Sequence, residues 1–131
     1  MKKENKIEVA KEIFKKFPTV KLAYLFGSQA RNEAGILSDY DFAIFADERD
    51  RNRLFDLKLL LMNDLSRIFG ENKTDVLMLN TAKSPELKYN AIREGKLIYE
   101  KEPFKVLVEP AIFNEYFDFH DMLLRHKLTK V

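Results

Sequence analysis

Short apolar runs alternate with longer amphipathic segments along this chain of 131 residues. Three runs, at 20–26, 40–46 and 74–79, are rich in aliphatic and aromatic residues and are bounded by proline, glycine or polar residues. This pattern predicts buried strands, because a strand covered on both faces reads as a nearly continuous apolar run. Leu97-Ile98-Tyr99 predicts a fourth strand, short and at the edge of the sheet.

The segments between these runs place apolar residues three and four positions apart, as an amphipathic helix does. The predicted helices are 4–17, 50–69, 85–94 and 111–128. Pro18, Gly70 and Gly95 supply stops for the first three, and Ser84 is an N-cap signal for the third. The order of elements predicts an α/β (α+β) fold, in which helices flank a small mixed sheet and a C-terminal helical tail follows.

The segment from Glu100 to Pro110 differs from the rest of the chain, because it has charges at both ends and contains two prolines. We interpret it as a linker or a loop over the domain, which divides the chain into a domain over 1–100 and a linker with C-terminal helix over 101–131. The predicted helix carries an aromatic stripe of Phe113, Tyr116, Phe117 and Phe119. This stripe either packs on its own domain or forms a surface for a partner or a second copy.

The composition narrows the class of protein. Hydrophobic residues make up 46% and charged residues 34%, which is typical of a soluble globular protein. A net charge of +2 gives no strong nucleic-acid signal, and the lack of cysteine excludes disulfides and thiolate chemistry. The first residues contain no apolar signal-peptide core, and no stretch is long enough to span a membrane, so we expect a cytoplasmic protein.

Candidate chemistry lies at the ends of the first two predicted strands. Gly27-Ser28 follows the first strand, and Asp39-Tyr40-Asp41 opens the second after ten intervening residues. Residues two apart on a strand project from the same face, so Asp39 and Asp41 are expected to lie together. Such carboxylates repel each other unless a cation lies between them or one of them keeps its proton, and their oxygens suit Mg²⁺.

The residues after Gly27 suit an anion. A glycine lets the backbone approach a phosphate, and segment 28–33 is predicted to form a short helix whose free amides attract phosphate oxygens. Ser28 either contacts a phosphate or only caps this helix, and a cap at a phosphate site can do both. Arg31 either contacts the same anion or is a surface residue.

The sequence Gly27-Ser28, ten residues, then Asp39-x-Asp41 resembles the active-site signature of the polymerase-β-like nucleotidyltransferases. The strings GSQAR and SDYDFAIF resemble the short, single-domain members of that family, the minimal nucleotidyltransferases (MNT). These proteins are often antitoxin partners of HEPN-domain ribonuclease toxins. The resemblance covers residues 6–100 and implies a third carboxylate on a later strand, for which Asp75 is well placed. The alternative for Asp75 is a solvated acidic residue at the start of a strand.

The resemblance also implies a function. Asp39, Asp41 and Asp75 would be catalytic and hold two Mg²⁺ ions, while Gly27, Ser28 and Arg31 would bind the nucleotide. AMP would pass from ATP to a hydroxyl, and in the antitoxin branch to a tyrosine of a cognate HEPN toxin.

Two alternatives stay open. One is a non-catalytic antitoxin or scaffold that neutralises its partner by binding alone. The other is an enzyme that modifies a small hydroxyl compound such as an aminoglycoside. The motif encodes neither the base preference, nor the number of nucleotides added, nor whether the protein forms a homodimer or a hetero-oligomer.

Overall fold

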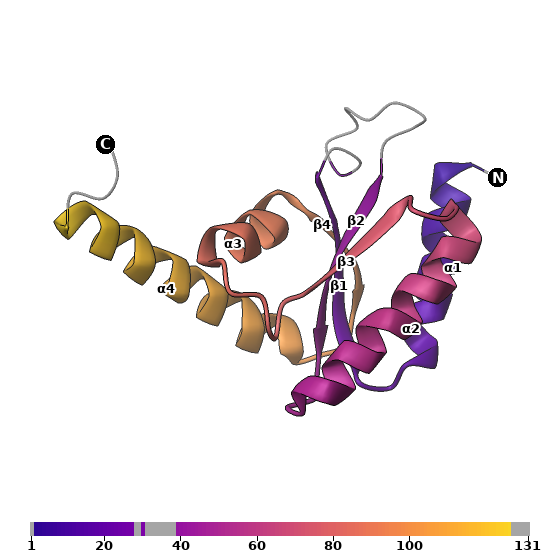
Figure 1. The fold of residues 1–131 in the computed structure, drawn as a ribbon, viewed down its shortest axis with the longest axis horizontal. Coiled ribbons are helices and arrows are strands. Elements are labelled where there is room, and N and C mark those ends of the chain that lie inside the picture. Colours follow the sequence, from indigo (N-terminus) through magenta and orange to yellow (C-terminus); the bar gives the residue numbers. More distant parts are fainter. Residues whose placement is uncertain (1, 28–29, 31–38, 127–131) are drawn as a thin grey trace.

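The computed structural model describes residues 2–27, 30 and 39–126. Within them, helices and strands follow one another in the predicted order (Figure 1). The elements are α1 (Lys3–Lys16), β1 (Val20–Phe26), β2 (Tyr40–Ala46), α2 (Arg51–Phe69), β3 (Thr74–Met78), α3 (Pro85–Glu94), β4 (Lys96–Glu100) and α4 (Phe104–Arg125). The predicted bounds of β1 and β2 are confirmed, and the predicted third strand is one residue longer than β3.

The strands form one mixed sheet in the order β3-β2-β1-β4. β1 runs antiparallel to both β2 and β4, whereas β2 and β3 are parallel and are joined through α2. β4 lies at one edge of this sheet, as the short apolar run predicted. β3 lies at the other edge, so β2 and β1 are the strands with neighbours on both sides.

Both faces of the sheet are covered. Figure 1 shows α1 and α2 on one face and α3 and α4 on the other. Neighbouring residues of β1 therefore enter different cores: Ala23 and Leu25 pack with α1 and α2, while Leu22 and Tyr24 pack with α3 and α4. This two-sided burial is the reason that the strands read as apolar runs rather than as alternating ones.

Side-chain caps fix the starts of α2 and α3, of which the cap at Ser84 was predicted. The side chain of Asp50 accepts hydrogen bonds from the backbone N–H groups of Asn52 (2.8 Å) and Arg53 (3.2 Å), which caps α2. Ser84 Oγ accepts one from the N–H of Leu87 at 3.1 Å and caps α3. Each cap satisfies donors that the first turn of a helix leaves without an intrahelical partner.

The interpretation of Glu100–Pro110 as a linker or loop is wrong over most of its length, because α4 begins at Phe104 and continues through Pro110. Proline in a helix interior removes one backbone hydrogen bond and costs about 3 kcal/mol. Tertiary contacts on either side of Pro110 offset that cost. Val108 and Ile112 are buried against the sheet, and Glu109 accepts a hydrogen bond of 2.5 Å from the Tyr24 hydroxyl.

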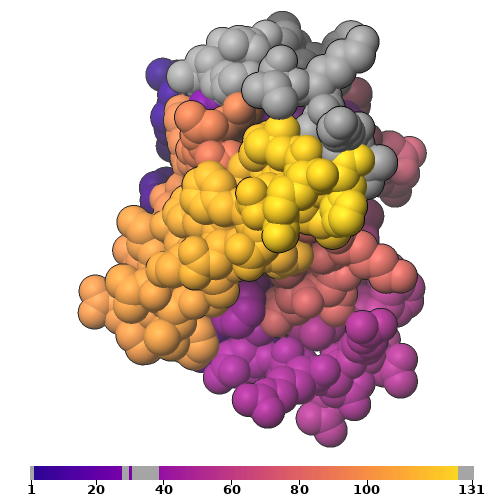
Figure 2. Space-filling view, turned by 90° about the vertical axis from the view of Figure 1, so that its left-hand side faces the viewer, coloured from indigo at the N-terminus to yellow at the C-terminus, as the bar shows by residue number. Residues whose placement is uncertain are grey.

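Further contacts hold α4 on its own domain, and Figure 2 shows it running across one face of the molecule beside α3. The ammonium of Lys88 on α3 lies 2.8 Å from a carboxylate oxygen of Glu115 on α4. The rings of Tyr89 and Tyr116 stack with centroids 3.9 Å apart. The first reading of the aromatic stripe, packing on its own domain, therefore holds for Tyr116, whereas Phe117 is 55% exposed. No helix among the described residues is long and apolar enough to cross a membrane.

Candidate active site

The end of β1 lies directly beside the start of β2. Phe26 is the register partner of Asp41, so the chain leaves the sheet at Gly27 next to the Asp41 side chain. Gly27 has a φ of +75°, in the left-handed region that favours glycine. A Cβ at this position would lie 2.6 Å from Asp41 Oδ2, which is closer than atoms can pack. The backbone conformation therefore favours glycine, and any side chain at this position would displace the Asp41 carboxylate.

Asp75 lies beside Asp41 because β2 and β3 are parallel. The two aspartates are register partners, and neighbouring strands of a sheet lie about 4.8 Å apart. Asp41, on an inner strand, is half-buried, whereas Asp75, on the edge strand, is exposed. Asp75 Oδ1 also accepts a hydrogen bond of 2.9 Å from the N–H of Val76. The carboxylates predicted from different parts of the sequence thus meet at one end of the sheet.

The three carboxylates influence one another. Burial raises the pKa of Asp41 above its usual range, and the charges of Asp75 and then Asp39 raise it further. Within the part of the chain that the structure describes, no lysine or arginine forms an ion pair with any of the three. The negative charge at this end of the sheet is therefore concentrated and not neutralised by those residues.

The donor set fits a hard divalent cation in part. The described residues contain no group of three His, Cys, Asp or Glu side chains arranged to hold a metal ion. Mg²⁺ does not require such a cage, because it usually takes one or two carboxylates and completes its shell with water and substrate phosphates. Asp41 and Asp75 are adjacent and supply carboxylate oxygens, which matches this coordination preference.

Two predicted nucleotide-binding residues, Ser28 and Arg31, lie outside the described residues, as does most of the predicted helix 28–33. The described Ala30 donates its N–H to the carbonyl oxygen of Gly27 at 3.2 Å. The roles of Ser28 and Arg31 stay predictions.

The sequence did not reveal the contacts that hold α4 behind this site. Tyr24, on β1 three residues before Gly27, is 1% exposed and is bonded to Glu109, which is 85 positions away in the sequence. Burial and this hydrogen bond raise the pKa of the Tyr24 hydroxyl well above its usual range, so it stays a donor. The tyrosine in a largely buried strand was the signal for a polar partner, because buried hydroxyls need one.

Comparison with known proteins gives the class that this fold and site define. The family model described as Polymerase beta, Nucleotidyltransferase matches residues 8–104, and the chain belongs to this family. A curated relative is the protein adenylyltransferase MntA of Aphanizomenon flos-aquae (strain 2012/KM1/D3). The two are 31% identical over 100 residues, and the match covers 72% of this chain and 66% of that protein, slightly less than two thirds of its length.

Solved structures share the fold. A chain in the crystal structure of a toxin-antitoxin with AMP-PNP superposes with a TM-score of 0.74 at 22% identity, over 95% of this chain and 94% of that one. A chain in a complex of tri-AMPylated Shewanella oneidensis HEPN toxin with MNT antitoxin superposes with a TM-score of 0.70 at 21% identity, with the same coverage. The predicted polymerase-β-like fold is confirmed.

Proposed function

We propose that this protein transfers AMP from ATP to a tyrosine hydroxyl of a cognate HEPN ribonuclease toxin, and that it is the antitoxin of that pair. The adjacency of Asp41 and Asp75 beside Gly27 carries the proposal, because it concentrates carboxylate oxygens, which can hold a divalent cation, next to a glycine whose backbone a phosphate can approach. The named activity of the Aphanizomenon relative and the toxin complexes among the structural neighbours support the choice of donor and acceptor.

The proposed chemistry is an in-line displacement. Gly27 lets the triphosphate approach the backbone, and Ser28 and Arg31 contribute further contacts. Asp75 accepts the proton of the tyrosine hydroxyl, whose oxygen then bonds to the α-phosphorus of ATP. The bond between that phosphorus and the oxygen bridging to the β-phosphorus breaks, and pyrophosphate leaves with the electron pair. Two Mg²⁺ ions held by Asp39, Asp41 and Asp75 would neutralise charge on the attacking and leaving oxygens.

The accessibility of the carboxylates agrees with these roles. Asp75 is exposed at the edge of the sheet, so an acceptor on another protein can reach it. Asp41 is half-buried and held beside Gly27, which suits a group that must stay in place while it holds a cation. The reaction belongs to the cytoplasm, where ATP and the RNA targets of a ribonuclease are found.

The test is intact-mass spectrometry of this protein mixed with ATP, Mg²⁺ and its co-encoded partner. We expect the partner to gain the mass of one or more AMP units. Asp39→Asn/Asp41→Asn should slow this transfer by about a thousandfold or more, since catalysis here is positioning and charge neutralisation. Asp56→Asn, an exposed aspartate of α2 away from the site, is the matched control and should leave the rate unchanged.

Two other outcomes would replace the proposal. A stable complex with no gain of mass would identify an antitoxin that acts by binding alone. Consumption of ATP with a small hydroxyl acceptor, in the absence of any protein partner, would identify a small-molecule nucleotidyltransferase.

A further inference from the structure

Among the residues that the structure describes, no strand lies beside the outer edge of β3. β2 pairs with β3 on one side only, and β3 is the last strand of the sheet order. The carbonyl oxygen of Lys73 accepts a hydrogen bond from the N–H of Tyr40, and the N–H of Leu79 donates one to the carbonyl oxygen of Ile44. The backbone groups of the odd-numbered residues in this segment therefore point toward β2. In a parallel ladder the residues between them turn their backbone groups to the opposite side. Those residues are Thr74, Val76 and Met78.

Some of the backbone groups on this edge already have hydrogen-bond partners within the chain. The Val76 N–H donates to Asp75 Oδ1, and the Met78 carbonyl accepts from the N–H groups of Thr81 and Ala82. Among the described residues, the outward groups of Thr74, the Val76 carbonyl and the Met78 N–H have no hydrogen-bond partner. An edge with free donors and acceptors can pair with a strand from another chain.

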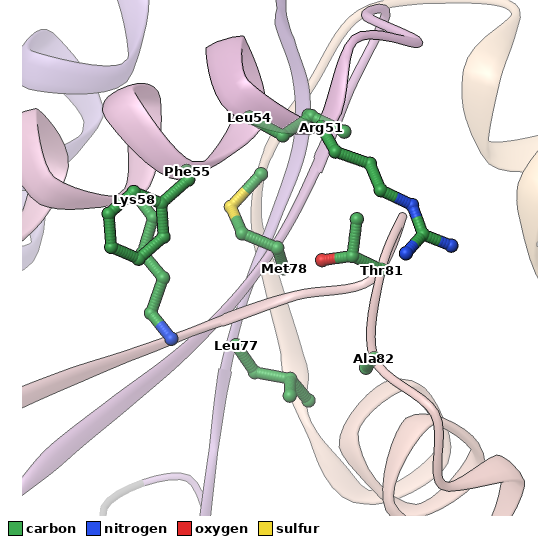
Figure 3. Close-up of a pocket in the computed structure, with 8 residues that line it drawn as sticks. All are labelled: Arg51, Leu54, Phe55, Lys58, Leu77, Met78, Thr81 and Ala82. Atoms are coloured by element: carbon green, nitrogen blue, oxygen red, sulfur yellow. The ribbon is translucent and has the colours of Figure 1, made fainter.

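A hollow of about 340 Å³ lies between α2 and the C-terminal end of β3 (Figure 3). The residues that line it include Arg51, Phe55, Lys58, Leu77, Met78 and Thr81. Figure 3 shows Lys58 extending from α2 toward β3, with Leu77 and Met78 on opposite sides of the strand. Phe55 is 59% exposed at the rim. The hollow thus offers apolar surface beside free backbone groups, the combination that an extended peptide needs.

The charged side chains that line the hollow indicate which kind of segment can bind there. Its lining contains two cations, Arg51 and Lys58, and no carboxylate. Neither cation has an ion-pair partner among the residues that the structure describes. A second copy of this chain, paired through the same edge, would bring the cations of both copies together, and like charges across an interface disfavour association. An acidic segment of a different protein fits the charge.

We propose that the open edge of β3 and the hollow beside it bind an extended segment of the acceptor protein, which is acidic where it crosses the hollow and adds to the sheet as a further strand. Asp75 lies on the same strand, three residues before Met78, or about 10 Å along it at the usual rise. A segment paired along β3 therefore passes from the hollow to the carboxylate that takes the acceptor proton. This step rests on the proposed function and adds how the acceptor is presented.

Binding of a defined peptide tests the inference without the chemistry. The probe is a fluorescein-labelled peptide of about ten residues with one tyrosine, in which valine alternates with glutamate only on the side of the tyrosine that would lie over the hollow. One control peptide carries lysine in place of glutamate. A second control keeps the glutamates but is N-methylated at alternate amides, which removes the donors that strand pairing requires. Fluorescence anisotropy with the whole protein, in the absence of ATP, should show binding of the probe and at least about tenfold weaker binding of both controls.

Variants of the protein complete the test. Arg51→Glu/Lys58→Glu should reverse the preference, so that the lysine peptide binds more tightly than the glutamate peptide. Lys105→Glu, which changes an exposed cation on α4, should leave the preference unchanged. If the charge-reversed protein fails to fold, Phe55→Ala replaces it and should weaken binding of the glutamate probe severalfold. Its matched control is Leu60→Ala, at a similarly exposed position of α2 that does not line the hollow.

Several results would overturn the inference. They are absence of saturable binding of the glutamate peptide, equal binding of the N-methylated peptide, and indifference to the charge reversal. Sedimentation that shows wild-type protein pairing with itself through this edge would assign the edge to a second copy instead. Because these measurements omit ATP, failure of AMP transfer with peptide binding intact would remove only the proposed function. Transfer to the partner without any role for the edge would remove only this inference.

Discussion

The replacement Gly27→Ala separates the geometry of the site from the stability of the fold. The new Cβ would meet Asp41 Oδ2 at 2.6 Å, and an ordinary contact begins at 3.4 Å, so the carboxylate must retreat by about 0.8 Å. The tip of an aspartate side chain can move that far at little energetic cost. The larger effect on stability comes from the φ of +75°, where a side chain costs about 1–2 kcal/mol.

The effect on activity should be much larger than the effect on stability. Displacing a catalytic group by about 1 Å can cost a factor of about 100 in rate. We therefore expect Gly27→Ala to remain folded and to transfer AMP about a hundredfold more slowly. The matched control is Gly70→Ala: Gly70 has a φ of +103°, and its nearest contact would be Lys73 Cγ at 3.4 Å. That variant should lose about 1–3 kcal/mol of stability and keep the wild-type rate.

Two assays test this prediction. Urea unfolding gives the free energy of unfolding of each variant, and intact-mass measurements over time give the initial rate of AMP addition. The reasoning is refuted if Gly27→Ala is folded and transfers AMP within about threefold of wild type, since Asp41 then tolerates displacement. It is also refuted if Gly70→Ala loses as much activity as Gly27→Ala, since the backbone strain alone would then account for the loss.

Three further predictions concern the free energy of unfolding. Asp41→Asn should raise it at neutral pH in EDTA. Burial and the neighbouring carboxylates raise the pKa of Asp41, so the ionised side chain destabilises the folded state above that raised pKa. The gain should vanish in acid below the usual carboxyl range, where Asp41 is protonated in both states. Tyr24→Phe should lower the free energy of unfolding by about 1–3 kcal/mol, because the half-buried Glu109 carboxylate loses its hydrogen-bond donor. Asp50→Ala should lower it by about 1 kcal/mol through loss of the α2 cap.

Each of these can be contradicted by the same unfolding curves. A gain for Asp41→Asn that persists unchanged in acid would mean that carboxylate repulsion is not its cause. An unchanged midpoint for Tyr24→Phe would show that Glu109 turns to water when the hydroxyl is removed. For Asp50→Ala, an unchanged midpoint would mean that other groups satisfy the first turn of α2.

Elements with strong local signals could be predicted from the sequence. The strands at 20–26 and 40–46 have the predicted bounds because proline, glycine and aspartate flank apolar runs. α2 and α3 begin and end at their capping residues for the same reason. Local patterns placed Gly27 and Asp41 at strand ends, but only the family resemblance implied that the two lie in one site, because their contact depends on the pairing of β1 with β2.

Features that depend on distant partners could not be predicted. The direction of β3 is set by how α2 crosses over the sheet, and no local pattern encodes it, yet it decides that Asp75 lies beside Asp41. Pro110 indicated a break in the chain. The buried contacts of Val108, Glu109 and Ile112 with elements far away in the sequence override that local preference. Tertiary packing outweighed propensity at this point.

The unequal exposure of Asp41 and Asp75 follows from the sheet order and limits what each can do. β2 has neighbours on both sides, so Asp41 is partly removed from water and held in place, at the cost of a raised pKa. β3 has an open side, so Asp75 keeps contact with solvent and with any chain that pairs along the edge. A group that fixes a cation benefits from the first environment, and a group that meets an incoming hydroxyl requires the second. If the roles were exchanged, the acceptor would have to reach the half-buried Asp41 beside Gly27 instead of the exposed Asp75 at the edge of the sheet.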